Sequence, residues 1–136
     1  MGKRPLSILP GKELSLPEIE PAPPRNDDSV PAMLADLSRI IHEPARLAIL
    51  TVLSTCVMAD FKYLQTATGL SKGNLSVQLG RLDEAGLTTS KRVIERKHTL
   101  TTVVLTDTGR SELARYWRQI ERIRARSTQR IDSKLE

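Results

Sequence analysis

The apolar positions of the chain change from a helical spacing to a strand-like one and then back. From Ala32, apolar residues recur every three or four positions, which predicts an amphipathic helix that ends near His42. Pro44 follows, and it excludes the α conformation at Glu43 while suiting the first turn of a second helix. The apolar residues of this second helix, up to Val57, lie almost all round it. We therefore expect it to be buried in the centre of the fold.

Two further helices with a short break are predicted next. Asp60 can cap the first, Gly69 can end it in the left-handed conformation, and Ser71 can cap the second, which runs to Gly86. The break from Gly69 to Ser71 has the length and composition of a helix-turn-helix corner. The second helix also carries leucines spaced by four and three residues, which predicts a stripe that faces the core. These leucines are Leu75, Leu79 and Leu82.

The opposite arc of that second helix is unlike an ordinary solvated surface. Its residues are mostly small or hydrogen-bonding, and each of its two glycines costs roughly 1 kcal/mol of helix propensity relative to alanine. A helix that must lie close against another surface has a reason to contain them; a neutral solvated face is the alternative. The arc consists of Gly73, Asn74, Val77, Gly80, Arg81 and Glu84, with Lys72, Ser76 and Gln78 on its flanks.

After Gly86 the spacing of apolar residues comes closer to two. Residues 87–94 and 99–105 are rich in β-branched side chains and enclose a charged segment, which predicts a β-hairpin with a charged tip. Residues 91–98 hold four basic residues against one acidic residue, a net charge of +3. Lysine that only protects an exposed edge strand from aggregation is the alternative explanation. The four basic residues are Lys91, Arg92, Arg96 and Lys97.

The last predicted helix begins at Thr106 and Asp107, which provide a cap and a favourable acidic first turn. A helix of this length on a small domain overhangs the core, and an overhanging apolar stripe requires a partner chain. We expect a homodimer anchored by Trp117, although a tryptophan that only seals its own domain is the alternative. The expected dimer interface consists of Met33, Leu34, Leu37, Leu113, Trp117 and Ile120.

Composition divides the chain of 136 residues into an arm and a folded part. Seven of its eight prolines fall within residues 1–31, which we expect to form a flexible, partly polyproline-like arm, with one domain over residues 32–136. The arm has four basic and five acidic residues, whereas the rest has 17 basic and 11 acidic ones. The basic excess thus lies in the part that folds, which favours a surface for an anionic partner; simple solubility is the alternative.

Several classes of protein are disfavoured by the residues that are missing. A single cysteine cannot form an internal disulfide or a Cys/His zinc site, and we expect no metal and no cofactor. No catalytic set of Ser, His and Asp and no glycine-rich phosphate loop is present, so we expect no enzyme. The longest charge-free stretch, residues 47–59, is too short to cross a membrane, and residues 1–12 do not form a secretory signal. We expect a soluble, cytoplasmic protein associated with the nucleoid.

The order of predicted elements resembles the winged-helix DNA-binding domain of ArsR/MarR-type bacterial and archaeal transcription regulators. The residues that carry the resemblance are IHEPARLAIL at 41–50, LQTATGLSKGNLSVQLGRLDEAGL at 64–87 and LTDTGR at 105–110, and it covers Met33 to about Ile123. The resemblance implies a mainly α fold with a small β-hairpin (α+β), a winged helix-turn-helix domain with a long C-terminal helix; the disordered N-terminal arm is expected from composition. It also assigns residues 72–85 to the DNA major groove and residues 91–98 to a wing on the DNA backbone or minor groove.

The chain departs from this family in two respects. The wing has no glycine or proline at its tip, and the paired cysteines of the metal-sensing ArsR members are missing. We therefore expect no metal sensing. Members of this family that bind effector ligands do so in clefts without a shared sequence motif, so the sequence does not predict an effector.

The side chains on the predicted recognition helix match the donor and acceptor groups of base pairs in the major groove. Arg81 and Lys72 can donate to guanine. Asn74 and Gln78 can pair with adenine through two hydrogen bonds each, and Val77 can contact a thymine methyl group. We expect these residues to provide the discrimination between DNA sequences.

Phosphate contacts are expected from other residues. Ser71 and the free N–H groups of its helix are suited to a phosphate, the basic hairpin would neutralise further phosphates, and Arg96 could enter the minor groove. The expected DNA-binding residues are Ser71, Lys72, Asn74, Ser76, Val77, Gln78, Arg81, Lys91, Arg92, Arg96 and Lys97.

These features predict a sequence-specific regulator that binds double-stranded DNA as a dimeric repressor at a pseudo-palindromic operator. A winged-helix module that binds proteins instead of specific DNA is the main alternative, and the acidic, proline-rich arm would suit such docking. RNA binding is third, because few aromatic residues are present to stack on bases.

Overall fold

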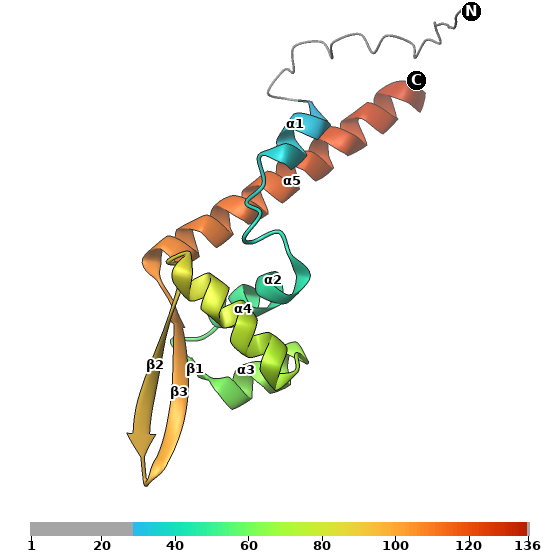
Figure 1. Ribbon diagram of the computed structural model, residues 1–136. Coiled ribbons are helices and arrows are strands. Elements are labelled where there is room, and N and C mark those ends of the chain that lie inside the picture. Colours follow the sequence, from blue (N-terminus) through green and yellow to red (C-terminus); the bar gives the residue numbers. More distant parts are fainter. Residues whose placement is uncertain (1–28, 136) are drawn as a thin grey trace, which may run out of the picture.

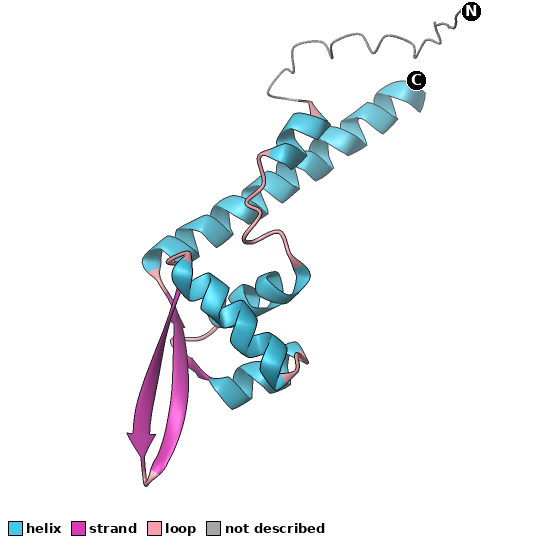
Figure 2. Ribbon diagram, in the orientation of Figure 1, coloured by secondary structure: helices cyan, strands magenta, loops and turns pink. Residues whose placement is uncertain are grey.

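The computed structural model describes residues 29–135, which form a mainly helical domain with a small antiparallel sheet (Figures 1 and 2). The expected fold class is confirmed. In chain order the elements are α1 (Val30–Ala35), α2 (Pro44–Ser54), β1 (Ala59–Asp60), α3 (Phe61–Thr68), α4 (Lys72–Glu84), β2 (Thr88–Glu95), β3 (His98–Leu105) and α5 (Asp107–Leu135).

The first helix differs from its prediction at both ends. It begins at Val30, because the Ser29 hydroxyl accepts a hydrogen bond from the Ala32 N–H at 3.3 Å and Pro31 occupies the first turn. The expected arm therefore ends earlier than Pro31, and its residues 1–28 lie outside the described part of the chain. The helix also ends at Ala35, and residues 36–43 form turns instead of the helix expected to reach His42.

The second helix begins where Pro44 predicts. Glu43 is extended, with φ −153° and ψ 129°, and its carboxylate accepts the N–H groups of Ala45 and Arg46 at 3.1 and 2.9 Å. The helix ends at Ser54, so the expectation that Val57 belongs to its buried surface is wrong. Val57 lies beyond the helix and is 89% exposed.

The predicted hairpin is confirmed within one residue at each strand boundary. Strands β2 and β3 pair from Thr88 opposite Leu105 to Glu95 opposite His98. Only Arg96 and Lys97 connect them, and both have positive φ, at 50° and 68°, which is the pattern of a tight two-residue hairpin turn.

The sheet has a third strand that the sequence pattern did not predict. Strand β1 contains two residues, pairs with β3, and gives the order β1-β3-β2. Two residues are too few for an alternating pattern to be recognised.

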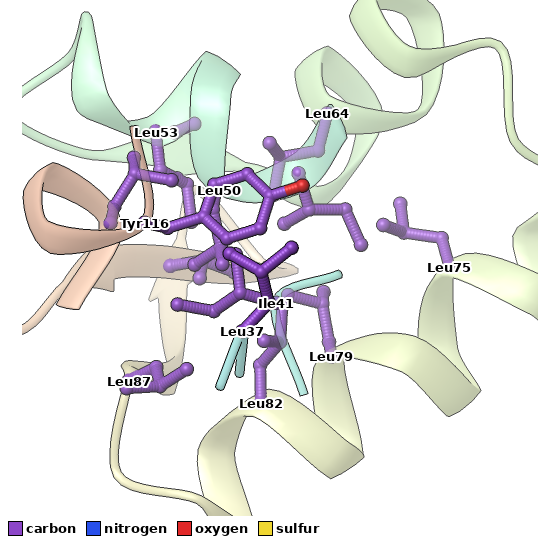
Figure 3. Packing of buried hydrophobic residues seen from close by; sticks show 14 residues of the cluster. Leu37, Ile41, Leu50, Leu53, Leu64, Leu75, Leu79, Leu82, Leu87 and Tyr116 are labelled. Atoms are coloured by element: carbon purple, nitrogen blue, oxygen red, sulfur yellow. The ribbon is translucent and has the colours of Figure 1, made fainter. Parts of the chain in front are cut away.

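The core lies between α2, α4 and the first half of α5 (Figure 3). The leucine stripe of α4 is buried as predicted. The turn segment before α2 adds Leu37 and Ile41, and α5 adds Leu113 and Tyr116. This packing leaves the opposite arc of α4 on the surface of the molecule.

Helix α5 extends well beyond the core. Its 29 residues span roughly 44 Å, and the Thr106 hydroxyl caps its start by accepting the Gly109 N–H at 2.9 Å. Of the elements that the structure describes, Figure 1 shows only α1 beside its C-terminal half. Gln119 and Arg115 connect the two helices through the carboxylate of Asp36, at 3.2 and 3.8 Å.

Candidate nucleic-acid interface

The corner between α3 and α4 fixes the direction of α4. Gly69 has φ 75° and ends α3, and the Ser71 hydroxyl caps α4 by accepting the Asn74 N–H at 3.1 Å. Both capping predictions are confirmed. Together with the buried leucine stripe, they hold α4 with its polar arc outward.

Most of the side chains expected to read DNA are exposed on α4. Val77 is 52% exposed although it is apolar, and Gly73 and Gly80 have nothing within 4 Å of an added Cβ atom. The exposed side chains are Ser71, Lys72, Asn74, Ser76, Val77 and Arg81. We call this surface the reading face.

Gln78 is the exception, because it is half-buried and already engaged. Its Oε1 accepts a hydrogen bond from Nη1 of Arg46 at 2.8 Å, and its Nε2 donates to Oδ1 of Asn74 at 3.1 Å. Each end of the Gln78 amide thus already holds one hydrogen bond within the protein. The expectation that Gln78 pairs with adenine stays a prediction, and such pairing must share or break these two hydrogen bonds.

Arg46 is the residue of this site that sequence reasoning missed. It is only 8% exposed, and its Nε donates to the Ile40 carbonyl at 2.6 Å. Its Nη1 also lies 3.7 Å from the Glu43 carboxylate. The available signal was the one charged residue of an otherwise uncharged helix that is expected to be buried, since a buried arginine must find several acceptors.

Glu43 completes the support of Arg46. Burial acts to raise the pKa of the Glu43 carboxyl, but the backbone N–H groups of Arg46 and Ala45 and the charges of Arg46 and Arg81 outweigh it. The net effect is a lowered pKa, so Glu43 remains ionised beside the guanidinium group.

The hairpin places Lys91 and Arg92 beside the reading face and carries its other two basic residues at its turn. Lys91, Arg92, Arg96 and Lys97 are all exposed. A groove of about 320 Å³ separates α4 from the hairpin, and the charged residues that line it are Lys91 and Arg92 and the acidic Asp83, with Ser76 and Gly80 between them and the reading face. A groove with cationic and hydroxyl groups beside an exposed polar helix can hold a polyanion such as a DNA backbone.

Comparison with known proteins identifies the type of domain. A family model described as a winged helix DNA-binding domain matches residues 45–123, which is more than half of the chain. The chain belongs to the winged-helix DNA-binding family. In the terms of this family, α4 is the recognition helix and the hairpin is the wing.

Individual proteins are similar to this chain in sequence or in fold. A transcriptional regulator homologue from Pyrococcus horikoshii OT3 is 30% identical, with a TM-score of 0.62 over 65% of this chain and 90% of that one. An uncharacterized protein of Methanocaldococcus jannaschii is 28% identical over 78 residues, which are 57% of this chain and 85% of the relative. The repressor CouR, solved with a 23-mer DNA duplex, shares the fold at 24% identity and a TM-score of 0.55, over 77% of this chain and 82% of CouR.

This winged-helix protein is a DNA-binding transcriptional regulator and not an enzyme. Within residues 29–135, no helix is long and apolar enough to cross a membrane. The same part of the chain contains no group of three or more His, Cys, Asp or Glu residues that could hold a metal ion.

The residues expected at a dimer interface of this winged-helix protein divide into two groups. Leu37 and Leu113 are 5% and 4% exposed within a single chain, so they belong to its own core and their assignment to the interface is wrong. Leu34 and Trp117 are 49% and 44% exposed. Met33 and Ile120 are half-buried beside them.

Proposed function

We propose that this winged-helix regulator binds specific double-stranded DNA as a homodimer and represses transcription in the cytoplasm, at the nucleoid. The observation that carries the proposal is the exposed reading face of α4 beside a wing with four exposed basic residues. A dimer presents two recognition helices, so the operator is a pseudo-palindrome with half-sites about 10 bp apart or a multiple of that distance. Occupation of such a site in a promoter excludes RNA polymerase.

Selection from randomised duplex DNA, followed by sequencing of the retained fraction, tests this function. A repeated motif with two related half-sites is the expected result. Retention without any motif would favour the second candidate, a protein-binding winged helix. The acidic balance of residues 1–31 is the feature that favours that candidate, because an acidic, proline-rich arm suits docking.

Different residues of the recognition helix contact the bases and the phosphates. Arg81 and Lys72 have only donor groups, which fit the O6 and N7 atoms of guanine, and Val77 fits the methyl group of thymine. Ser71 lies at the start of α4, where free N–H groups favour a phosphate. Phosphate contacts fix the position of the helix, and base contacts provide the discrimination.

Replacement of Arg81 by alanine is expected to weaken binding to the selected site by about 1–3 kcal/mol, with little change on random DNA. The reason is the loss of a base contact that random sequences do not provide. Fluorescence anisotropy with both duplexes measures the two affinities. Arg126→Ala, on the distant half of α5, is the matched control and should change neither; equal losses on both duplexes with Arg81→Ala would contradict the assignment.

The wing is expected to provide affinity without discrimination. The double variant Arg96→Asn with Lys97→Gly removes two charges and gives the two positive-φ positions residues that favour this conformation. We expect an equal loss on all sequences, and a plot of log affinity against log salt that is shallower by roughly two units. An unchanged slope would show that the wing tip does not contact the DNA phosphates.

Dimerisation is proposed to occur through the exposed apolar surface of α1 and α5. Trp117 packs edge-on against buried Tyr116, with ring centroids 5.3 Å apart, which leaves its outer face free for a partner chain. Trp117→Ala should shift sedimentation velocity toward the monomer and leave the melting of the single domain nearly unchanged. If the variant dimerises with unaltered affinity, or if it loses stability without any change in its assembly, Trp117 acts within its own domain and not at the interface.

A further inference from the structure

A chain of side-chain hydrogen bonds connects the buried Arg46 with the reading face of α4. Nη1 of Arg46 donates to Oε1 of Gln78 at 2.8 Å, and Nε2 of Gln78 donates to Oδ1 of Asn74 at 3.1 Å. Arg46 is buried, Gln78 is half-buried and Asn74 is exposed. This series of hydrogen bonds therefore leads from the core to a residue on the surface that is proposed to contact base pairs.

The buried end of this chain is held firmly. The Nε of Arg46 donates to the Ile40 carbonyl at 2.6 Å, and its Nη2 donates to the Arg39 carbonyl at 3.4 Å. The Glu43 carboxylate lies 3.7 Å from Nη1. With these partners on the turn segment and at the start of α2, the guanidinium group cannot turn away from Gln78 without losing several hydrogen bonds.

The direction of every hydrogen bond in the chain follows from the chemistry of Arg46. A guanidinium group has five N–H donors and no acceptor, so only the carbonyl end of the Gln78 amide can face it. The NH2 end of Gln78 must then point outward, and it requires an acceptor, which Oδ1 of Asn74 provides. The Asn74 amide is thereby oriented with its Oδ1 toward Gln78, where one lone pair is used, and with its NH2 group turned away from Gln78.

We propose that Arg46, acting through Gln78, fixes the side chain of Asn74 as a hydrogen-bond donor and thereby selects guanine at the base pair that Asn74 contacts. This inference rests on the proposed DNA-binding function. A freely rotating asparagine pairs with adenine, because adenine offers N7 as an acceptor and N6 as a donor. An asparagine whose NH2 group faces the base while its Oδ1 is turned toward Gln78 fits guanine, which offers two acceptors, and it opposes cytosine, which offers a donor. Arg46 is a positioning residue in this scheme, since it does not touch DNA.

The decisive variant is Gln78→Glu, which reverses the direction of the outer hydrogen bond. A carboxylate still accepts from Arg46, but it cannot donate to Asn74. The Asn74 amide must then turn over and donate to the new carboxylate, so that its Oδ1 faces the DNA as an acceptor. The negative charge lies beside a buried guanidinium group, which favours a folded variant.

Selection from randomised duplex DNA compares the wild-type chain with this variant. We expect guanine at one position of the wild-type motif and a base with a donor, cytosine or adenine, at the same position for Gln78→Glu, with a relative preference changed by roughly tenfold. All other positions should be unchanged. Gln78→Met is the second variant; it removes the connection and should leave guanine and adenine nearly equal at that position.

A measurement without DNA separates this inference from the proposed function. In the wild-type chain, the side-chain NH2 protons of Asn74 should exchange with solvent at the rate of a free amide in NMR spectra. In Gln78→Glu, one of them should become protected. Protection of the Asn74 NH2 group in the wild-type chain, or identical motifs for all three proteins, would overturn the inference. A wild-type chain that selects no motif, but shows the expected exchange pattern, would overturn the proposed function alone.

Discussion

Replacement of Gly109 by alanine is expected to destabilise the domain more than the same replacement at any other glycine that the structure describes. A Cβ atom at this position would lie 2.0 Å from the Leu87 carbonyl oxygen and 2.9 Å from the Leu87 carbonyl carbon. It would also lie 2.8 Å from Cδ1 of Leu105. Two of these three atoms belong to the backbone, so the clash cannot be relieved by a change of rotamer.

The site of this clash holds the domain together. Leu87 connects α4 to β2, and its carbonyl accepts the Thr106 N–H at 3.0 Å, while the Thr106 hydroxyl donates to the Gly86 carbonyl at 2.7 Å. A movement of α5 away from Leu87 would break these contacts between the recognition helix, the wing and α5. We expect a loss of roughly 3 kcal/mol in the free energy of unfolding and a melting temperature lower by roughly 10–20 °C.

Gly73→Ala is the matched control for this prediction. It adds the same methyl group to a helix, but at a position with nothing within 4 Å. Here alanine should raise stability by roughly 0.5–1 kcal/mol through its better helix propensity. Thermal melting followed by circular dichroism checks both variants, and a Gly109→Ala protein that melts within a few degrees of wild type would show that Leu87 moves aside easily.

The close contact at Gly109 illustrates what a sequence can and cannot predict. The capping residues and the leucine stripe of α4 act over a few neighbouring positions, so their pattern predicted the helix-turn-helix and the exposed face. Gly109 looks like an ordinary helical glycine, because the backbone that it touches lies 22 residues earlier in the chain. Contacts of that kind depend on tertiary packing and leave no local pattern.

The two aromatic residues of α5 show a related limit. A spacing of four residues puts Trp117 on the same face of the helix as Leu113, and a spacing of three puts Tyr116 on that face equally well. The structure buries Tyr116, whose hydroxyl lies 2.7 Å from Nδ1 of His42, and leaves Trp117 half exposed. The helical pattern could not separate these two residues, and the contact with His42 lies on a segment 74 residues away.

In the candidate site, too, local sequence patterns predicted some features and tertiary contacts determined others. The exposure of Arg81, Asn74 and Val77 followed from the leucines on the other side of α4, and the charge of the wing followed from its composition. The engagement of Gln78 did not, because its partner Arg46 lies 32 residues earlier on another helix. The sequence therefore predicted which surface of α4 is exposed, but not the hydrogen bonds that orient its side chains.

Replacement of Arg46 by methionine is the other change with a large expected effect on stability. Methionine has a similar length and fills much of the same space, but it removes every donor. The carbonyls of Ile40 and Arg39 and the Oε1 of Gln78 would lose their partners in a part-buried environment. Because unsatisfied buried acceptors are costly, we expect a loss of about 2–4 kcal/mol in the free energy of unfolding.

Arg39→Met provides the control, since Arg39 is an exposed arginine on the adjoining turn segment and should change stability by less than about 0.5 kcal/mol. Urea unfolding at several pH values gives a second readout. The lowered pKa of Glu43 means that the folded state binds its proton less readily than the unfolded state, so this contribution is present above the unfolded pKa and is lost as the pH falls through the folded one. Removing the charge of Arg46 should weaken that dependence on acid. A variant as stable as wild type, with the same acid profile, would show that Arg46 contributes little net stabilisation and that the turn before α2 is held by its apolar residues alone.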